Sequence, residues 1–167
     1  MTTKEADLTA EIKTIFKTDA RIQNEKRIWI KTDSKKLIET CKWIRKQGFL
    51  HLSAISVTDW LEKGVYEITY HLWSYEEKIL ITVKTSINRK KPVIESVTPI
   101  WYESAQIHER ELHELFGVKF QGNHDLSPLF LEGWEGKAPF KKDFNWREYV
   151  RETFYDKKNE REKVYYD

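Results

Sequence analysis

The sequence predicts an α+β fold: a mixed, largely antiparallel sheet with flanking helices and an extended C-terminal segment. Apolar residues recur at helical spacing near the start of the chain and again after residue 100. Between these two regions the apolar residues alternate with polar ones, which is the pattern of a half-buried strand. Strands grouped between helices are typical of the α+β class.

Two helices and a short strand are expected before the alternating region. Residues 8–16 carry apolar side chains at helical spacing, and residues 37–45 do so again. Asp33 or Ser34 offers a side-chain oxygen that can cap the start of the second helix. Residues 28–30, Ile-Trp-Ile, lie between the two helices and favour a strand.

Three strands are expected in the middle of the chain. Leu50, Leu52 and Ala54 occupy alternate positions, and the alternation returns over residues 66–72 and 79–83. The polar stretches between these runs are short, so we expect consecutive strands to pair as an antiparallel meander.

A further helix is expected over residues 105–116, after a basic loop at residues 88–92. Gly117 follows this helix and suits a left-handed cap, because glycine has no Cβ to clash. A short strand comes next. One face of the helix is apolar and its charged residues lie elsewhere: the apolar set is Ala105, Leu112, Leu115 and Phe116, and the charged set is Glu109, Arg110 and Glu114.

The composition limits the possible functions. Cys41 is the only cysteine, which excludes a disulfide framework and a metal or iron–sulfur site built on several thiolates. The net charge of +2 does not favour nucleic acid as a partner. Charged residues make up 34% of the chain, and abundant Lys and Glu are typical of thermophiles. The longest apolar runs are too short to cross a membrane, so we expect membrane association only through partner proteins.

His108 and His113 enclose a segment, HERELH, that is similar to the two-histidine zinc box of metallopeptidases. That box needs histidines four residues apart on one helix face. Here the second histidine is five residues later, which turns it by roughly 140° about the helix axis. We therefore expect no zinc pair. The alternative hypothesis is a stand-alone metal-dependent enzyme, which would use Glu109, His113, His124 and Asp125.

Three acids surround one base on the same helix. Glu109, Glu111 and Glu114 lie close in sequence to Arg110, a pattern typical of ion pairs on a solvated or partner-facing helix. A contribution to a proton relay is the alternative.

Aromatic and basic residues after the helix favour a surface that binds another protein. Trp134, between two glycines, either anchors an interface or packs under its own loop. Lys141 and Lys142 beside Asp143 favour a salt-bridged contact over an anion site.

An ordered series of residues in the second half of the chain carries a family resemblance: Glu109-Arg110-Glu111, Glu114, Phe116-Gly117, Phe120, Gly122, Asp125-Leu126, Trp134, Gly136, Pro139 and Lys142-Asp143-Phe144. With this series, about residues 28–144 resemble the C subunit of NADH:quinone oxidoreductase, the complex I 30-kDa subunit family. His113 and Gly122-Asn123 are similar to the branch found in group 4 membrane-bound [NiFe] hydrogenases and related archaeal respiratory complexes. His124, Ser127-Pro128 and Lys141 depart from the family, which usually has Pro, basic residues and Arg there.

The resemblance implies a non-catalytic structural and assembly subunit in the hydrophilic arm of a membrane-bound respiratory oxidoreductase. Members of this family bind no cofactor and lie against a hydrogenase-like large subunit, near an iron–sulfur small subunit. The implied complex couples electron transfer to ion translocation, with this subunit peripheral on the cytoplasmic side of the membrane. A quinone-, methanophenazine- or sulfur-linked relative is the alternative.

The resemblance also implies a division of the chain and a contact surface. Residues 1–140 would form an α/β domain like that of the family's 30-kDa subunits, and residues 141–167 an extended partner-binding tail. The expected partner interface consists of Glu109, Arg110, Glu111, His113, Glu114, Phe116, Asp125, Trp134, Lys141, Lys142, Asp143 and Phe144.

Overall fold

The structure, a computed structural model, describes residues 3–155. Its α-helices are α1 (Lys4–Phe16), α2 (Leu37–Lys46), α3 (Tyr102–Phe116) and α4 (Trp146–Val150), and it has two short 3-10 helices, η1 (Ser34–Lys36) and η2 (Leu61–Lys63), and a π-helix, η3 (Arg151–Tyr155). Its strands are β1 (Asp19–Asn24), β2 (Arg27–Lys31), β3 (His51–Trp60), β4 (Val65–Ser74), β5 (Ile79–Asn88), β6 (Val93–Glu95) and β7 (Lys119–Gln121). No helix within residues 3–155 has the length and apolar character needed to span a membrane.

The main sheet has five strands in the order β1-β2-β5-β4-β3. The strands β3, β4 and β5 form the predicted antiparallel meander, and β2 joins it by pairing parallel to β5. The short strands β6 and β7 pair parallel in a second, two-stranded sheet. The predicted α+β class with a mixed, largely antiparallel sheet is therefore confirmed.

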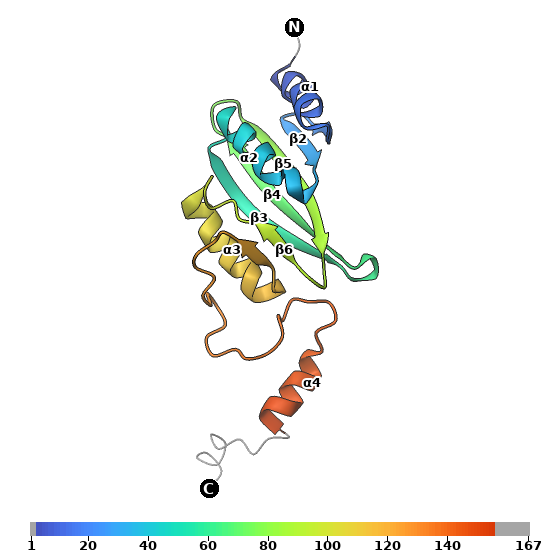
Figure 1. The fold of residues 1–167 in the computed structure, drawn as a ribbon, viewed down its shortest axis with the longest axis vertical. Coiled ribbons are helices and arrows are strands. Elements are labelled where there is room, and N and C mark those ends of the chain that lie inside the picture. The colour runs from blue at the N-terminus through green and yellow to red at the C-terminus, as the bar shows by residue number, and fades with distance from the viewer. Residues whose placement is uncertain (1–2, 156–167) are drawn as a thin grey trace.

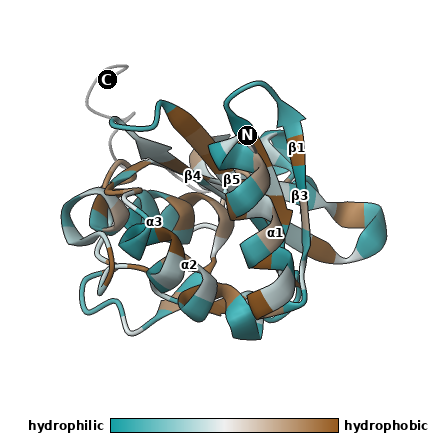
Figure 2. Ribbon diagram, turned by 90° about the horizontal axis from the view of Figure 1, so that it is seen from above, coloured by the Kyte–Doolittle hydropathy of each residue, from teal (hydrophilic) through white to brown (hydrophobic). Residues whose placement is uncertain are grey.

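The helices α1, α2 and α3 pack on the same face of the main sheet (Figures 1 and 2). Residues of all three helices belong to one core with the inward residues of the strands. On β4, the central strand of the meander, Tyr66, Ile68, Tyr70 and Leu72 are fully buried, as the alternation predicts. Cys41 lies in this core, and burial raises the pKa of its thiol to about 12.

Several elements differ from the expectation. The helix α1 begins at Lys4, where Thr3 caps it, and β1 has no periodicity that would predict it. Leu50 is 65% exposed, because β3 begins after it and a bulge between Leu52 and Ala54 shifts the register of that strand. The C-terminal segment is extended only in part, since α4 and η3 are helical. Tail residues 156–167 lie outside the described residues.

Candidate functional site

A long segment leaves the domain after β7 and passes along α3 before it reaches α4 (Figure 1). We call residues 122–155 the C-terminal arm. Residues 122–145 of the arm are irregular, so their backbone polar groups need partners outside a regular ladder. The side chains of α3 supply many of these partners, at three places along the arm.

Glu114 holds the middle of the C-terminal arm. Its carboxylate accepts hydrogen bonds from the backbone N–H groups of Leu129 (3.3 Å), Phe130 (2.9 Å) and Leu131 (2.7 Å). Although burial opposes it, these N–H groups and the nearby Arg110 hold the pKa of Glu114 below its usual value. One ionised side chain thus fixes three consecutive residues of the arm.

Replacement of Glu114 by Ala should loosen the arm without unfolding the domain. We expect a loss of about 1–2 kcal/mol, because the hydrogen bonds to a charged group are lost but the freed amides can reach water. Amide hydrogen exchange at Leu129, Phe130 and Leu131 should become faster. Glu111→Ala is the control, since within residues 3–155 the one ion pair of Glu111 is with His108, at 4.0 Å. Equal exchange in the two variants would refute this role of Glu114.

Arg110 and Gln106 hold the start of the arm through its carbonyl groups. The Arg110 Nε donates to the carbonyl of Ser127 (3.1 Å) and its Nη2 to that of Pro128 (2.9 Å), while Gln106 donates to the carbonyl of Asp125 (2.6 Å). We expected Arg110 to form ion pairs with the acids of its own helix. This prediction is wrong, because the hydrogen bonds of Arg110 go to the arm.

Glu109 lies in the interior, with no exposed surface. Its carboxylate accepts hydrogen bonds from the Ser96 hydroxyl (2.7 Å), the Val97 N–H (2.8 Å) and the Asn123 side chain (2.8 Å). The prediction that Glu109 lies off the buried face is wrong, because β6, β7 and the segment after β6 cover that side of α3 and supply polar partners. Glu109 thus joins α3 to the start of the arm from inside.

The buried carboxyl of Glu109 should give the chain a measurable pH dependence. Burial raises its pKa above the ordinary value of 4.5, although its three hydrogen bonds oppose the shift. At pH values between 4.5 and the raised pKa, the folded chain binds more protons than the unfolded chain. The free energy of unfolding therefore falls as the pH rises through this window. The side chain in Glu109→Gln does not titrate, so the free energy of unfolding of the wild type, relative to this variant, should fall as the pH rises through the same window. If the free energies of unfolding of the two proteins changed in parallel with pH, the raised pKa of Glu109 would be contradicted.

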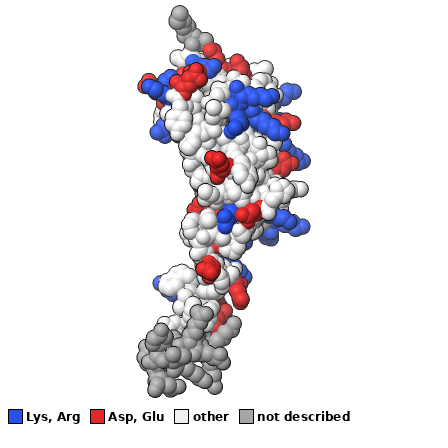
Figure 3. All heavy atoms as spheres, turned by 90° about the vertical axis from the view of Figure 1, so that its left-hand side faces the viewer, with Lys and Arg blue, Asp and Glu red and all other residues white. Residues whose placement is uncertain are grey.

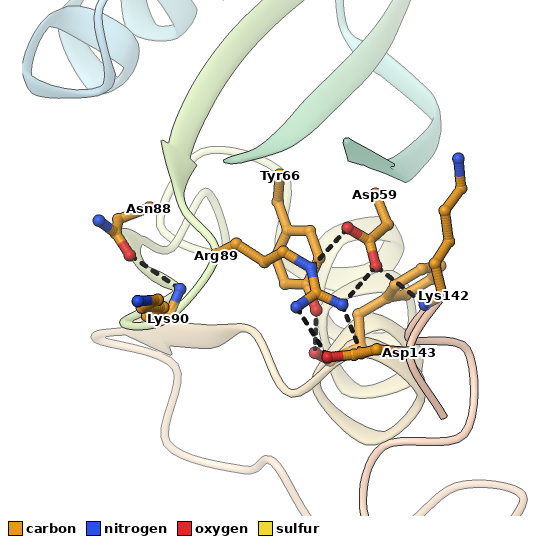
Figure 4. Close-up of polar contacts among 8 residues, drawn as sticks. Asp59, Tyr66, Asn88, Arg89, Lys90, Lys142 and Asp143 are labelled. Carbon is orange, nitrogen blue, oxygen red and sulfur yellow. Dashed lines mark hydrogen bonds and ion pairs between the residues drawn. The ribbon is translucent and has the colours of Figure 1, made fainter. Parts of the chain in front are cut away.

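Arg89 joins the arm to the end of the main sheet (Figure 4). Its guanidinium donates to Asp59 at the end of β3, at 2.7 and 2.9 Å, and to Asp143 of the arm, at 3.1 Å from Nη1. The backbone N–H of Lys142 also donates to Asp59 (3.0 Å), and the guanidinium lies over the Tyr66 ring, 5.7 Å from its centre. We call these residues the Arg89 junction.

The electrostatics of the Arg89 junction favour the ionised pairs. Burial opposes ionisation of Asp59, but the hydrogen bonds from Arg89 and Lys142 and the charge of Arg89 lower its pKa. The hydrogen bonds from Arg89 likewise lower the pKa of Asp143. Burial, followed by the charge of Asp59, raises the pKa of Tyr66 to about 12. Asp143 therefore forms its ion pair with Arg89, and the charge of the neighbouring Lys141 also contributes to its lowered pKa.

An aromatic cluster holds the end of the arm. Trp134 packs on Tyr149 with ring centres 4.5 Å apart, and Phe144 lies against both rings. Gly136 lies beneath this stack, where a Cβ would come within 2.8 Å of both the Trp134 and the Tyr149 rings. Of the two roles considered for Trp134, the structure shows the packing within its own segment.

Three other residues of the predicted interface, His113, Phe116 and Lys141, lie near the end of α3 and make different contacts. His113 shares a hydrogen bond between Nδ1 and the carbonyl of Val118 (2.8 Å) and so helps to end α3. Phe116 packs between Tyr66 and Phe140. Lys141 lies beside Gly117. The partner interface itself stays a prediction.

The arm presents large apolar side chains to solvent. Phe130, Phe140 and Trp146 are 64%, 58% and 59% exposed, and Phe154 and Tyr155 of η3 are also exposed. Exposed apolar side chains concentrated on one segment mark an interaction surface, and aromatic residues are enriched in such surfaces.

The four residues of the metal-dependent alternative do not form a common ligand set. Glu109 is bonded to Ser96, Val97 and Asn123, and His113 is bonded to Val118. Within residues 3–155, no group of three or more His, Cys, Asp or Glu side chains is arranged to hold a metal ion. The charged groups on α3 hold polypeptide segments in place.

The sequence comparisons agree with this architecture. The family described as "Respiratory-chain NADH dehydrogenase, 30 Kd subunit" matches residues 30–150. The C subunit of the F(420)H(2) dehydrogenase of Methanosarcina mazei is 32% identical over 128 residues, which are 75% of this chain and 80% of that protein. The C subunit of the NADH-quinone oxidoreductase of Moorella thermoacetica is 35% identical over 99 residues, which are 59% of this chain and 66% of that one. The chain belongs to the respiratory-chain NADH dehydrogenase 30 kDa subunit family.

Solved structures show the same fold. A chain of the membrane-bound sulfane sulfur reductase, an archaeal respiratory membrane complex, matches with a TM-score of 0.81 and 24% identity over 91% of this chain and 92% of that one. A trypsin-resistant fragment of Nqo5 matches with a TM-score of 0.62 and 22% identity, over 72% of this chain and 98% of the fragment.

Proposed function

We propose that the chain is a non-catalytic structural and assembly subunit in the hydrophilic arm of a membrane-bound respiratory oxidoreductase. It docks on a hydrogenase-like large subunit, close to the iron–sulfur small subunit, at the cytoplasmic side of the membrane. Family membership supports the proposal, as do the names of its relatives, which are subunits of respiratory dehydrogenases. The partners hold the redox centres and carry out the coupled ion translocation.

The observation that carries this proposal is the C-terminal arm. Charged side chains at four places, namely Glu114, Arg110, Glu109 and the Arg89 junction, hold the arm together with an aromatic cluster, while the outer aromatic side chains of the arm face solvent. A surface that is already ordered before docking loses less conformational entropy on binding. We therefore place the partner contact on the arm, with residues 141–167 as the partner-binding tail.

The exposed aromatic residues of the arm should carry the docking. We expect Phe140→Ser combined with Trp146→Ser to reduce the amount of the large subunit that co-purifies with this chain by about tenfold or more. Ile15→Ser is the matched control, because Ile15 is 53% exposed and belongs to α1, which lies at the opposite end of the molecule from α4 (Figure 1). Equal recovery of the large subunit with both variants would refute the arm as the docking surface.

The type of respiratory complex has a second candidate. The relative that is 32% identical belongs to an F(420)H(2) dehydrogenase, so a complex linked to quinone, methanophenazine or a sulfur compound is an alternative to a hydrogenase. Purification of the tagged chain from solubilised membranes distinguishes the two. A large subunit with nickel would support the hydrogenase, a large subunit without nickel would support the alternative, and recovery of the chain alone would contradict both.

A further inference from the structure

A hollow with three basic side chains lies between α2 and the segment before α3. It has a volume of about 470 Å³ and is lined by Lys42, Arg45, Lys46, Leu50, Pro99 and Ile100. A second hollow of about 240 Å³ shares Lys42, Pro99 and Ile100 and extends to Gly122, where the C-terminal arm begins. We call the two together the basic trough. Figure 3 shows basic side chains gathered on the upper part of this face, at the level of α2.

The trough carries more basic than acidic side chains: among the described residues, Lys42, Arg45 and Lys46 line it with one exposed acid, Glu95. Lys42, Arg45 and Lys46 are exposed, and none of them forms an ion pair with another side chain of residues 3–155. Arg45 and Lys46 lie in the last turn of α2, where the helix dipole favours a cation. The dipole does not explain Lys42, which lies a turn earlier and borders both hollows.

The trough also offers apolar surface beside its charges. Leu50 is 65% exposed, in the connection between α2 and β3, and Pro99 is exposed across the hollow from it. Ile100 forms part of the floor and is only 6% exposed. Basic side chains around an apolar floor are complementary to a chain segment that carries both carboxylates and an apolar residue.

We propose that the basic trough binds an acidic, amphipathic segment of a neighbouring subunit. Its carboxylates pair with Lys42, Arg45 and Lys46, and an apolar side chain packs between Leu50 and Pro99. The proposal rests on the proposed function, because the neighbour belongs to the same complex. It adds a second contact that is distinct from the exposed aromatic residues of the arm.

A photo-reactive residue in the trough tests this proposal. Leu50 is replaced by benzoylphenylalanine in the tagged chain, the complex is purified, and the adducts are located by mass spectrometry. We expect an adduct with a segment of another subunit that is rich in Asp and Glu. Lys42→Glu with Arg45→Glu should reduce its yield by about tenfold or more.

Lys13→Glu is the matched control, because Lys13 also lies in the last turn of a helix but outside the trough, and it should leave the yield unchanged. The midpoint of thermal unfolding shows whether each variant is folded. A purified complex that gives no adduct at Leu50, an adduct with lipid, or an adduct with a segment without excess acid overturns the trough proposal alone. Failure of the wild-type chain to purify with any subunit overturns the proposed function and this proposal with it.

Discussion

Replacement of Arg89 by Ala should destabilise the chain by about 3 kcal/mol. Asp59 is 4% exposed, and its carboxylate would lose two hydrogen bonds and its neutralising charge while remaining buried. The contact with Asp143 adds less, because that side chain is about half exposed and its charge is screened by water. Urea unfolding at neutral pH measures the loss.

Two further variants make the Arg89 test specific. Lys90→Ala changes an exposed cation in the same loop and should alter the stability by less than about 0.5 kcal/mol. Asp59→Ala added to Arg89→Ala should restore part of the loss, because the uncompensated carboxylate is then absent. A loss with Arg89→Ala no greater than that with Lys90→Ala would show that the Arg89 junction does not stabilise the fold.

Replacement of Glu109 by Ala should cost about 3 kcal/mol. The change leaves the buried N–H of Val97 without its acceptor and opens a cavity between α3 and the segment after β6. Glu109→Gln keeps the volume and one acceptor oxygen, so it should cost less. Thermal unfolding of both variants, with Glu111→Ala as a partly exposed control on the same helix, tests this. A loss with Glu109→Ala below about 1 kcal/mol would mean that the site relaxes or admits water.

The antiparallel strands β4 and β5 of the main sheet could be predicted because their signal is local. The alternation over β4 and β5 follows directly from the pleat, and one face of each strand is buried. The strand β1 could not be predicted, since only Ala20 of its residues is buried and the alternation is therefore absent. The bulge in β3 could not be predicted either, because it depends on pairing with β4.

The contacts of the site depend on residues far apart in sequence. The basic loop at residues 88–92 could be predicted, but nothing local distinguishes Arg89 from Lys90 and Lys91 as the partner of Asp143, which lies 54 residues later. Glu109 has the sequence surroundings of a surface residue on a charged helix, and the residues that contact it, Ser96, Val97 and Asn123, come from the segments that follow β6 and β7. The family resemblance located this region, whereas the roles of its side chains required the fold.

The most direct test of the account compares the free chain with the purified complex by hydroxyl-radical footprinting. We expect Phe140 and Trp146 to be oxidised readily in the free chain, where both are more than half exposed, and to be protected in the complex. Ile15, which belongs to α1 at the opposite end of the molecule from α4, should react equally in both. Equal oxidation of Phe140 and Trp146 in the free chain and in the complex would contradict docking through the C-terminal arm.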